Sequence, residues 1–163
     1  MRPIKFTNAH KTSYLSELVC SNSFRSDDKF FNAVGLLHEE MRVLDSLIMR
    51  CADKSKVPAG SALAVDREVF SQNIEEEINK NQFISISREE VCKPELEKWR
   101  KTIIATGPLT SEKLSTYIKS LTKENNLAFF DALSPIVYYD SIDFKICWFQ
   151  SRYDKGTSKD YIN

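Results

Sequence analysis

Glycine is scarce in this chain of 163 residues, which contains only four. They are Gly35, Gly60, Gly107 and Gly156, and no two of them lie close together. The chain therefore contains neither a Gly-x-Gly-x-x-Gly turn nor a P-loop, the glycine-rich motifs that commonly hold nucleotide phosphates. A motif of either kind is excluded within these residues.

Metal-ligand patterns and long apolar runs are also missing. The four cysteines, Cys20, Cys51, Cys92 and Cys147, are widely spaced, and there are only two histidines. This spacing excludes the common zinc motifs and is typical of reduced thiols, so we expect no metal site. No apolar run reaches the roughly 18 residues of a membrane-spanning helix, and no signal-peptide pattern opens the chain. We expect a cytoplasmic protein that does not enter a membrane.

Charge of one sign does not dominate either. The 23 basic residues are balanced by 23 acidic ones. No overall field attracts nucleic acid, so any RNA contact would need a local patch. An apolar content of 42% and the length of the chain suit one globular domain or part of one.

Apolar residues recur at helical spacing in three segments. Residues 30–53 carry one every three or four positions, which predicts a single long helix with a buried face, a coiled coil being the alternative. Asp66 is expected to cap a second helix, and Thr110 or Ser111 a third. The apolar faces of the second and third helices are Phe70, Ile74 and Ile78, and Leu114, Tyr117, Ile118 and Leu121.

Strands are predicted in the second half of the chain. Residues 83–87 alternate apolar and polar, and the run 102–108 ends in Thr-Gly-Pro, which is typical of a buried strand that stops abruptly. Aromatic and β-branched residues then gather in segments 129–130, 136–139 and 144–149, where we also expect strands.

Residues 17–28 place Cys20 among small hydroxyl and amide side chains, ahead of the predicted long helix. Asp27 and Asp28 are expected to cap that helix, whose N-terminal dipole would favour a thiolate at Cys20. On residue type alone, a small buried cysteine is the more frequent reading than a reactive one. His38, beside two glutamates, is expected to be solvated.

Several stretches together resemble one family, among them residues 33–42, Ala-Val-Gly-Leu-Leu-His-Glu-Glu-Met-Arg. The others are residues 1–3, 17–28, 46–49, 57–60, 62–67, 103–111, 129–132, 140–143 and 148–155. In them the chain resembles the TrmFO family of FAD- and folate-dependent tRNA uracil-5-methyltransferases, which methylate the T-loop uridine of bacterial tRNA. The resemblance runs from the first residue to the last.

The resemblance implies an α/β fold. Residues 1–126 would form an incomplete FAD/NAD(P)-binding domain, Rossmann-like and of the glutathione-reductase type, that lacks its N-terminal βαβ unit. Residues 127–163 would begin an inserted α+β domain. In the family, the glycine-rich turn for the FAD pyrophosphate lies before the matched segment, and a second functional cysteine lies after it. A chain without the central parallel strand is expected to be poorly stable.

The resemblance also implies site residues. Cys20 would be the catalytic thiol, engaged while the uracil ring is activated, with methylenetetrahydrofolate supplying the methylene group and FAD and NAD(P)H the reduction. For three of the residues expected near FAD there is an alternative. Arg2 is alternatively a surface arginine, and Thr106 and Gly107 alternatively form a tight turn. The residues expected near FAD are Arg2, Asn22, Ser23, Arg25, Thr106 and Gly107.

Three functions follow from this reading. The chain is a TrmFO-like polypeptide without activity of its own, one part of a split methyltransferase whose other chains supply the remaining segments, or a protein- or RNA-binding fragment. We favour the first, because the expected cofactor anchor is not among these residues. The substrate of the family, tRNA, is the expected partner in the second.

Overall fold

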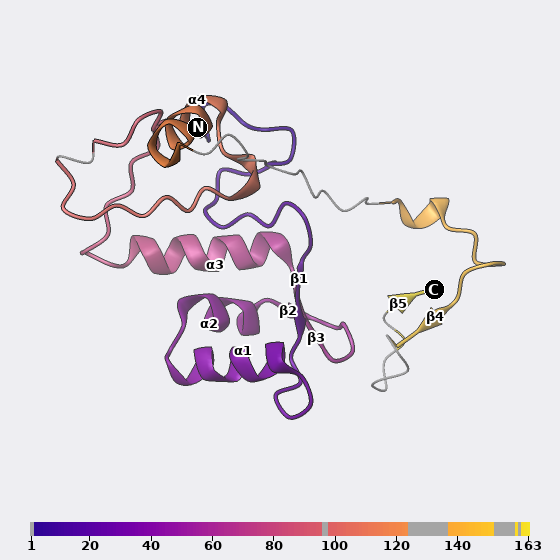
Figure 1. The fold of residues 1–163 in the computed structure, drawn as a ribbon. Helices are drawn as coiled ribbons and strands as arrows, with labels where there is room; N and C mark the ends of the chain where they lie inside the picture. The colour runs from indigo at the N-terminus through magenta and orange to yellow at the C-terminus, as the bar shows by residue number, and fades with distance from the viewer. Residues whose placement is uncertain (1, 96–97, 124–136, 152–158, 160) are drawn as a thin grey trace. The chain divides into compact units, whose positions relative to one another are not determined.

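The computed structural model describes residues 2–95, 98–123, 137–151, 159 and 161–163 (Figure 1). The chain divides into two compact units. The first unit comprises Met1–Lys11 and Ile86–Ala132, and the second comprises Thr12–Ser85 and Leu133–Asn163. The boundary predicted between residues 126 and 127 falls outside the described residues, so that division stays a prediction.

A small antiparallel sheet organises the second unit. Strand β3 (Ala62–Val65) lies between β1 (Ser23–Ser26) and β2 (Lys56–Val57), and all four β3 residues are buried. The β1–β3 pairing is irregular between Ser23 and Ser26, where Arg25 has a φ of 74°. The mixed helix and strand content agrees with the predicted fold class. Every strand pair in the described residues is antiparallel, whereas the prediction placed a parallel sheet here.

The helix that follows β3 confirms the second predicted helix. In α3 (Arg67–Asn79), the N-cap Asp66 accepts hydrogen bonds from the backbone N–H groups of Glu68 and Val69, both at 3.0 Å. This is the capping that the sequence predicted. Phe70 and Ile74 are each 1% exposed, so α3 buries the face expected of it.

The single helix predicted for residues 30–53 is wrong. Two helices are present, α1 (Ala33–Val43) and α2 (Leu47–Lys54). Between them Asp45 has a φ of 55°, which is incompatible with a continuous helix, and the Ser46 side chain accepts a hydrogen bond from the Met49 backbone to cap α2. The apolar spacing continued across this break, so periodicity alone did not reveal it.

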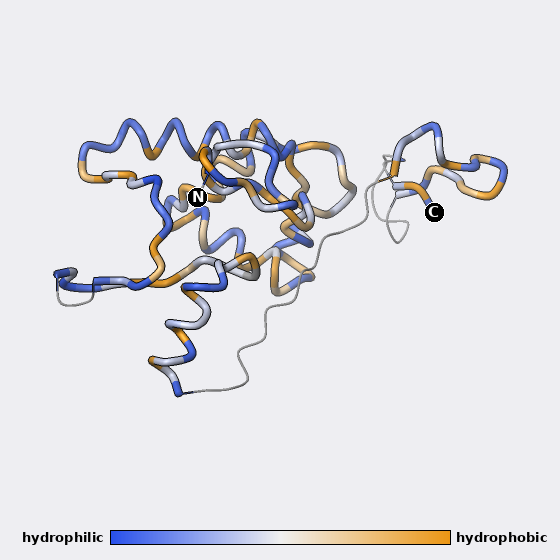
Figure 2. Tube along the Cα trace, turned by 90° about the horizontal axis from the view of Figure 1, so that it is seen from above, coloured by the Kyte–Doolittle hydropathy of each residue, from blue (hydrophilic) through white to orange (hydrophobic). Residues whose placement is uncertain are grey.

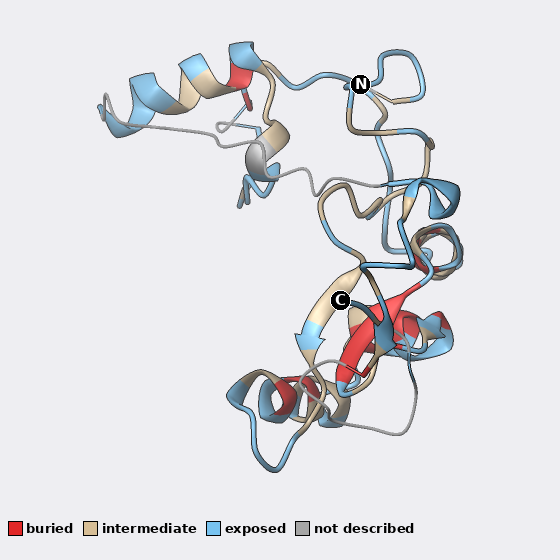
Figure 3. Cartoon of the chain, turned by 90° about the vertical axis from the view of Figure 1, so that its right-hand side faces the viewer, coloured by how far each residue is buried: buried red, intermediate tan, exposed pale blue. Residues whose placement is uncertain are grey.

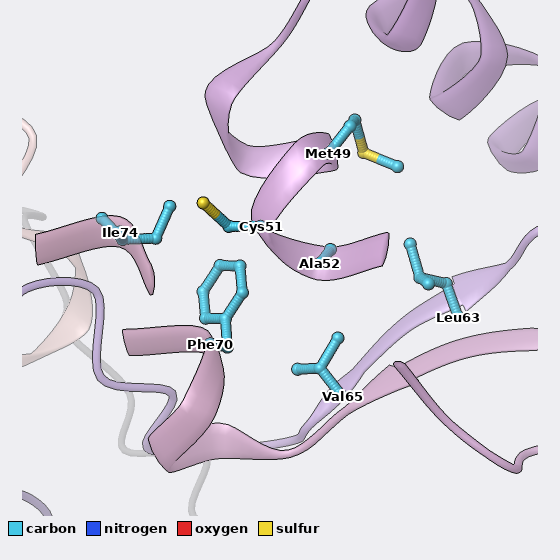
Figure 4. Close-up of a cluster of buried hydrophobic side chains, with 7 residues drawn as sticks. All are labelled: Met49, Cys51, Ala52, Leu63, Val65, Phe70 and Ile74. Carbon is cyan, nitrogen blue, oxygen red and sulfur yellow. The ribbon is translucent and has the colours of Figure 1, made fainter. Parts of the chain in front are cut away.

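The core of the second unit lies between α2, β3 and α3. Figure 4 shows the Cys51 and Ala52 side chains of α2 facing Phe70 and Ile74 of α3, with Leu63 and Val65 of β3 beside them. Phe24 of β1 adds an edge-to-face contact with Phe70, their ring centroids 5.5 Å apart. The buried residues in Figure 3 fall largely on these elements. Burial of such side chains is the main favourable term in the stability of this unit.

The strands predicted at residues 83–87 and 102–108 are also wrong. Residues 83–87 are exposed and form no strand, and Gly107–Leu109 form a 3-10 helix, η1. Figure 2 shows hydrophobic residues scattered among hydrophilic ones along the chain, but no strand of the described residues pairs with residues 83–87 or 102–108. A strand needs a neighbour for its backbone hydrogen bonds, which an alternating pattern does not supply.

The third predicted helix is confirmed in the first unit. It is α4 (Glu112–Thr122), and the Ser111 side chain accepts a hydrogen bond from the Leu114 backbone at 3.4 Å. Leu114 is buried, whereas Leu121 at the other end is half exposed.

Little of the predicted C-terminal strand structure is present. Residues 129–130 and 136 lie outside the described residues. Residues 137–148 contain a 3-10 helix, η2 (Tyr139–Ser141), and only β4 (Phe149–Gln150) is a strand, paired antiparallel with β5 (Tyr161–Ile162). The Phe144 ring stacks on Phe149, so the aromatic residues here pack on one another.

None of the helices described in Figure 1 has the length and apolar character to cross a membrane.

Candidate functional site

The segment around Cys20 leads into the edge strand β1. Cys20 is half-buried in a bend, and no cysteine of the chain forms a disulfide. The Arg67 guanidinium donates a hydrogen bond from Nη2 to the Cys20 carbonyl at 3.1 Å. Arg67 is the first residue of α3, so one charged side chain ties the backbone at Cys20 to the start of that helix.

The long helix that the sequence predicted after Cys20 does not follow this residue directly. Strand β1 and residues 27–32 separate Cys20 from α1. The favouring of a thiolate at Cys20 therefore stays a prediction.

Asn22 extends the pairing of β1 with β3. Its carbonyl accepts a hydrogen bond from the Val65 N–H at 2.9 Å, and its side-chain Nδ2 donates to the Val65 carbonyl at 3.0 Å. The amide of Asn22 therefore holds the entry to β1 in place. In this structure its side chain shapes the segment that carries Cys20.

Two serines set the backbone of the same segment. Ser21 Oγ accepts from the Ser23 N–H, and Ser23 Oγ accepts from the Arg25 N–H, both at 3.1 Å. Such turns stabilise local bends, here leading to the positive φ of Arg25. Arg25 itself is exposed, so its guanidinium is available to a negatively charged ligand.

The other predicted site residues belong to the first unit. Thr106 Oγ1 and Thr110 Oγ1 are 2.6 Å apart, and Thr110 Oγ1 also donates to the Gly107 carbonyl at 2.7 Å. Gly107 has a φ of 66°, and no atom lies within 4 Å of the position that a Cβ would take. Arg2 lies in the same unit. The predicted residues are therefore divided between the two units, with Cys20, Asn22, Ser23 and Arg25 in the second and Arg2, Thr106 and Gly107 in the first.

Both sets have features that fit a flavin nucleotide in part. The open space at Gly107 would admit close approach of a ligand to the backbone, and Arg25 could pair with a phosphate. The side chains of Asn22 and Ser23 are engaged with the backbone instead, Asn22 with Val65 of β3 and Ser23 with Arg25. Each set by itself offers only some of the groups that hold a flavin nucleotide, and the described residues contain no glycine-rich turn for its pyrophosphate.

An ionic cluster just after β1 was missed by the sequence reading. Asp27, whose side chain is 14% exposed, lies 3.1 Å from His38 Nδ1, 2.9 Å from Arg42 Nη2 and 3.3 Å from Lys56 Nζ. Asp27 therefore caps no helix, and His38 is buried rather than solvated, so both predictions were wrong. The spacing of His38 and Arg42, four residues apart on one helix face, is the signal that could have indicated the cluster.

Charge is well compensated in this cluster. Burial raises the pKa of the Asp27 carboxyl, but hydrogen bonds from Arg42, His38 and Lys56 outweigh it and hold that pKa below its ordinary value. Arg42 also donates to Asp53 from Nε at 2.8 Å and from Nη2 at 2.7 Å, and this pairing raises the pKa of Arg42. The cluster links the end of β1 to α1, α2 and β2.

Asp28 and Gly35 bring α1 close to the residues that follow β1. Asp28 Oδ1 accepts hydrogen bonds from the backbone of Phe30 and Phe31 at 3.0 and 3.1 Å, while Asn32 is the N-cap of α1. The prediction that Asp28 caps the helix was therefore wrong. Gly35 is buried against the Asp28 backbone, where a Cβ would overlap the carbonyl group.

The Arg67 hydrogen bond gives a direct test of how Cys20 is held. We expect an Arg67→Met variant to react faster with iodoacetamide at Cys20, by about threefold to tenfold, because loss of a charge-assisted hydrogen bond of roughly 1.5 to 3 kcal/mol frees this bend. Mass spectrometry of the alkylated peptides measures the rate at each cysteine. Cys92, in the first unit, is the internal control, and equal acceleration at Cys92 would show general unfolding instead.

Comparisons with known proteins agree with the family resemblance seen in the sequence. The family model described as glucose inhibited division protein A matches residues 4–163. Curated proteins named methylenetetrahydrofolate–tRNA-(uracil-5-)-methyltransferase TrmFO are 58% identical in Brucella anthropi and 59% identical in Bartonella bacilliformis, over 167 aligned residues. The alignments cover all of this chain and 35% and 36% of those relatives, so the chain spans about a third of their length. The resemblance to TrmFO is confirmed, and the chain belongs to the glucose inhibited division protein A family.

Proposed function

We propose that this chain carries part of the site of a folate-dependent tRNA uracil-5-methyltransferase and has no activity on its own. The observation that carries the proposal is identity of 58% along the whole chain to relatives named for this activity, of which it spans 35%. A site shared among segments of one protein is expected to fail when only one segment is present.

Cys20 is the proposed catalytic residue. In the proposed reaction its thiol engages the uracil ring of tRNA, the substrate, while methylenetetrahydrofolate supplies the one-carbon group. When bound, FAD would supply the reducing chemistry, with NAD(P)H as its reductant. Arg25 and Gly107, with Arg2 and Thr106, are the residues proposed to contact it, and Asn22 and Ser23 support the Cys20 segment. We propose a cytoplasmic location, as expected for tRNA modification.

The proposal is tested with the purified chain. We expect no flavin absorption after purification and no methylated uridine when tRNA is incubated with the chain, FAD, methylenetetrahydrofolate and NAD(P)H. The Brucella anthropi relative, assayed in parallel, serves as the positive control. Stoichiometric flavin on this chain alone, or methylation of tRNA by it, would contradict the proposal.

A second candidate is that the chain becomes active together with polypeptides that supply the other segments. The large apolar side chains exposed on and beside α1 favour this candidate, because they suit an interface. In a complemented mixture, Cys20→Ser should reduce tRNA methylation by at least about 100-fold, as expected for a lost nucleophile. Cys92→Ser is the control. An equal loss of tRNA methylation in both variants would contradict a catalytic role for Cys20.

A further inference from the structure

Helix α1 turns Gly35, His38 and Met41 toward the unit and leaves most of its other large apolar residues exposed. Gly35 and His38 are its buried residues, and Arg42 reaches inward to Asp27. Large apolar side chains point away from the unit instead. They are Phe30 (80% exposed), Phe31 (89%), Leu36 (49%), Leu37 (52%), Val43 (80%) and Leu44 (81%), and together we call them the α1 apolar face.

This orientation is set by specific contacts. Gly35 lies so close to the Asp28 backbone that a Cβ at this point of the helix would overlap it. His38 and Arg42 meet Asp27 on the same side, within 3.1 Å and 2.9 Å. Turning α1 to bury its leucines would therefore break the ionic cluster and move Gly35 away from Asp28.

An exposed apolar surface of this kind indicates an interface. A helix on the surface of a soluble protein ordinarily directs its apolar side to the core and its charged side to water. Contiguous apolar patches on a surface mark sites where another polypeptide binds, since their exposure to water is unfavourable. Phosphate-rich RNA is a poor fit, because its contacts come mainly from basic and polar side chains.

We propose that the α1 apolar face is the docking surface for polypeptide equivalent to the remaining two thirds of the TrmFO relatives. The relatives match this chain over only 35% of their length, so most of such a protein lies outside the matched 167 residues. This inference rests on the proposed function, in which the chain is one part of a larger site, and it names the surface by which that part associates.

The test measures association and not catalysis. The Brucella anthropi residues outside the matched 167 are produced as separate polypeptide and co-expressed with the full chain. Size-exclusion chromatography with light scattering should show a complex. Leu37→Lys combined with Leu44→Lys should weaken that complex at least about tenfold, since a charge in an apolar interface costs more than 1.4 kcal/mol.

The matched control places the same two charges elsewhere on the second unit, as Val69→Lys with Phe83→Lys, and should change the affinity less than about twofold. Far-UV circular dichroism should be the same for both double variants, because all four positions are exposed. A complex that forms without methylating tRNA would overturn the second candidate function, activity of the combined polypeptides, and leave this inference standing.

Four results would overturn the inference. The first is the absence of a complex, and the second is a complex that the Leu37→Lys and Leu44→Lys substitutions leave intact. The third is a homodimer of this chain that the same substitutions dissociate, which would assign the α1 apolar face to a second copy. The fourth is protection of Leu37 and Leu44 from hydroxyl-radical labelling in the isolated monomer, which would assign the face to other residues of this chain.

Discussion

An Asp27→Asn variant is expected to unfold with a free energy about 3 kcal/mol smaller than that of the unsubstituted chain, since it removes the mostly buried carboxylate at the centre of the ionic cluster. His38 and Lys56 would lose their ionised partner, while Arg42 would keep Asp53. Urea unfolding followed by circular dichroism at neutral pH measures the difference between the two proteins.

The contribution of Asp27 should depend on pH in a defined direction. Burial raises the pKa of its carboxyl, but hydrogen bonds from Arg42 and His38 lower that pKa by more. The pKa of Asp27 in the folded chain is therefore below the ordinary value. The group therefore binds its proton more readily in the unfolded chain. Its stabilisation is fully present above the unfolded pKa and is lost as the pH falls through the folded pKa, so the difference between Asp27→Asn and the unsubstituted chain should shrink below about pH 4.

Asp45→Asn provides the comparison for this effect. Asp45 also pairs with an arginine, Arg50, but its side chain is 79% exposed. An exposed pair of this kind contributes about 0 to 1 kcal/mol, so the control should unfold nearly as the unsubstituted chain does. If both variants lost the same free energy of unfolding, the burial of Asp27 would add nothing to its contribution to stability.

Gly35→Ala is expected to lower the free energy of unfolding by about 3 kcal/mol, because the added methyl would overlap the backbone carbonyl of Asp28. Backbone atoms cannot rotate away as a flexible side chain can, so α1 would have to shift. The gain from alanine's better helix propensity, about 1 kcal/mol, is too small to offset this.

Ala33→Val is the control for Gly35→Ala, because it adds bulk to the same helix at an exposed position. It should cost less than about 0.7 kcal/mol, the usual range of helix propensities. The same urea unfolding experiment compares the two variants. A Gly35→Ala variant as stable as the unsubstituted chain would show that α1 can move away from Asp28 at little cost.

Sequence patterns predicted correctly what depends on neighbouring residues. Asp66 caps α3 and Ser111 caps α4, because a capping side chain acts two or three residues along the chain. The family resemblance, which uses the order of many short segments, was confirmed as well. The site residues Cys20, Asn22, Ser23 and Arg25, together with Arg2, Thr106 and Gly107, stay predictions.

The wrong predictions are of two kinds. Some depend on contacts between residues that are distant in sequence, and one depends on a helix break that the apolar spacing does not reveal. Residues 30–53 kept a helical period through Asp45, although the backbone there has a positive φ. Residues 83–87 and 102–108 had strand patterns, but no described strand pairs with them. The capping role assigned to Asp27 failed because its partners come from α1 and from Lys56, beyond the reach of a local pattern.

The sequence by itself determined where α3 and α4 begin, which family the chain belongs to, and which thiol deserves a chemical test. Only the tertiary structure decided how α1 is turned. The reason is physical: apolar spacing defines a helix face, but the contacts of Gly35 with Asp28 and of His38 and Arg42 with Asp27 select the face that packs inward. They leave Leu37 and Leu44 outward, and so present a surface that the sequence had assigned to the core.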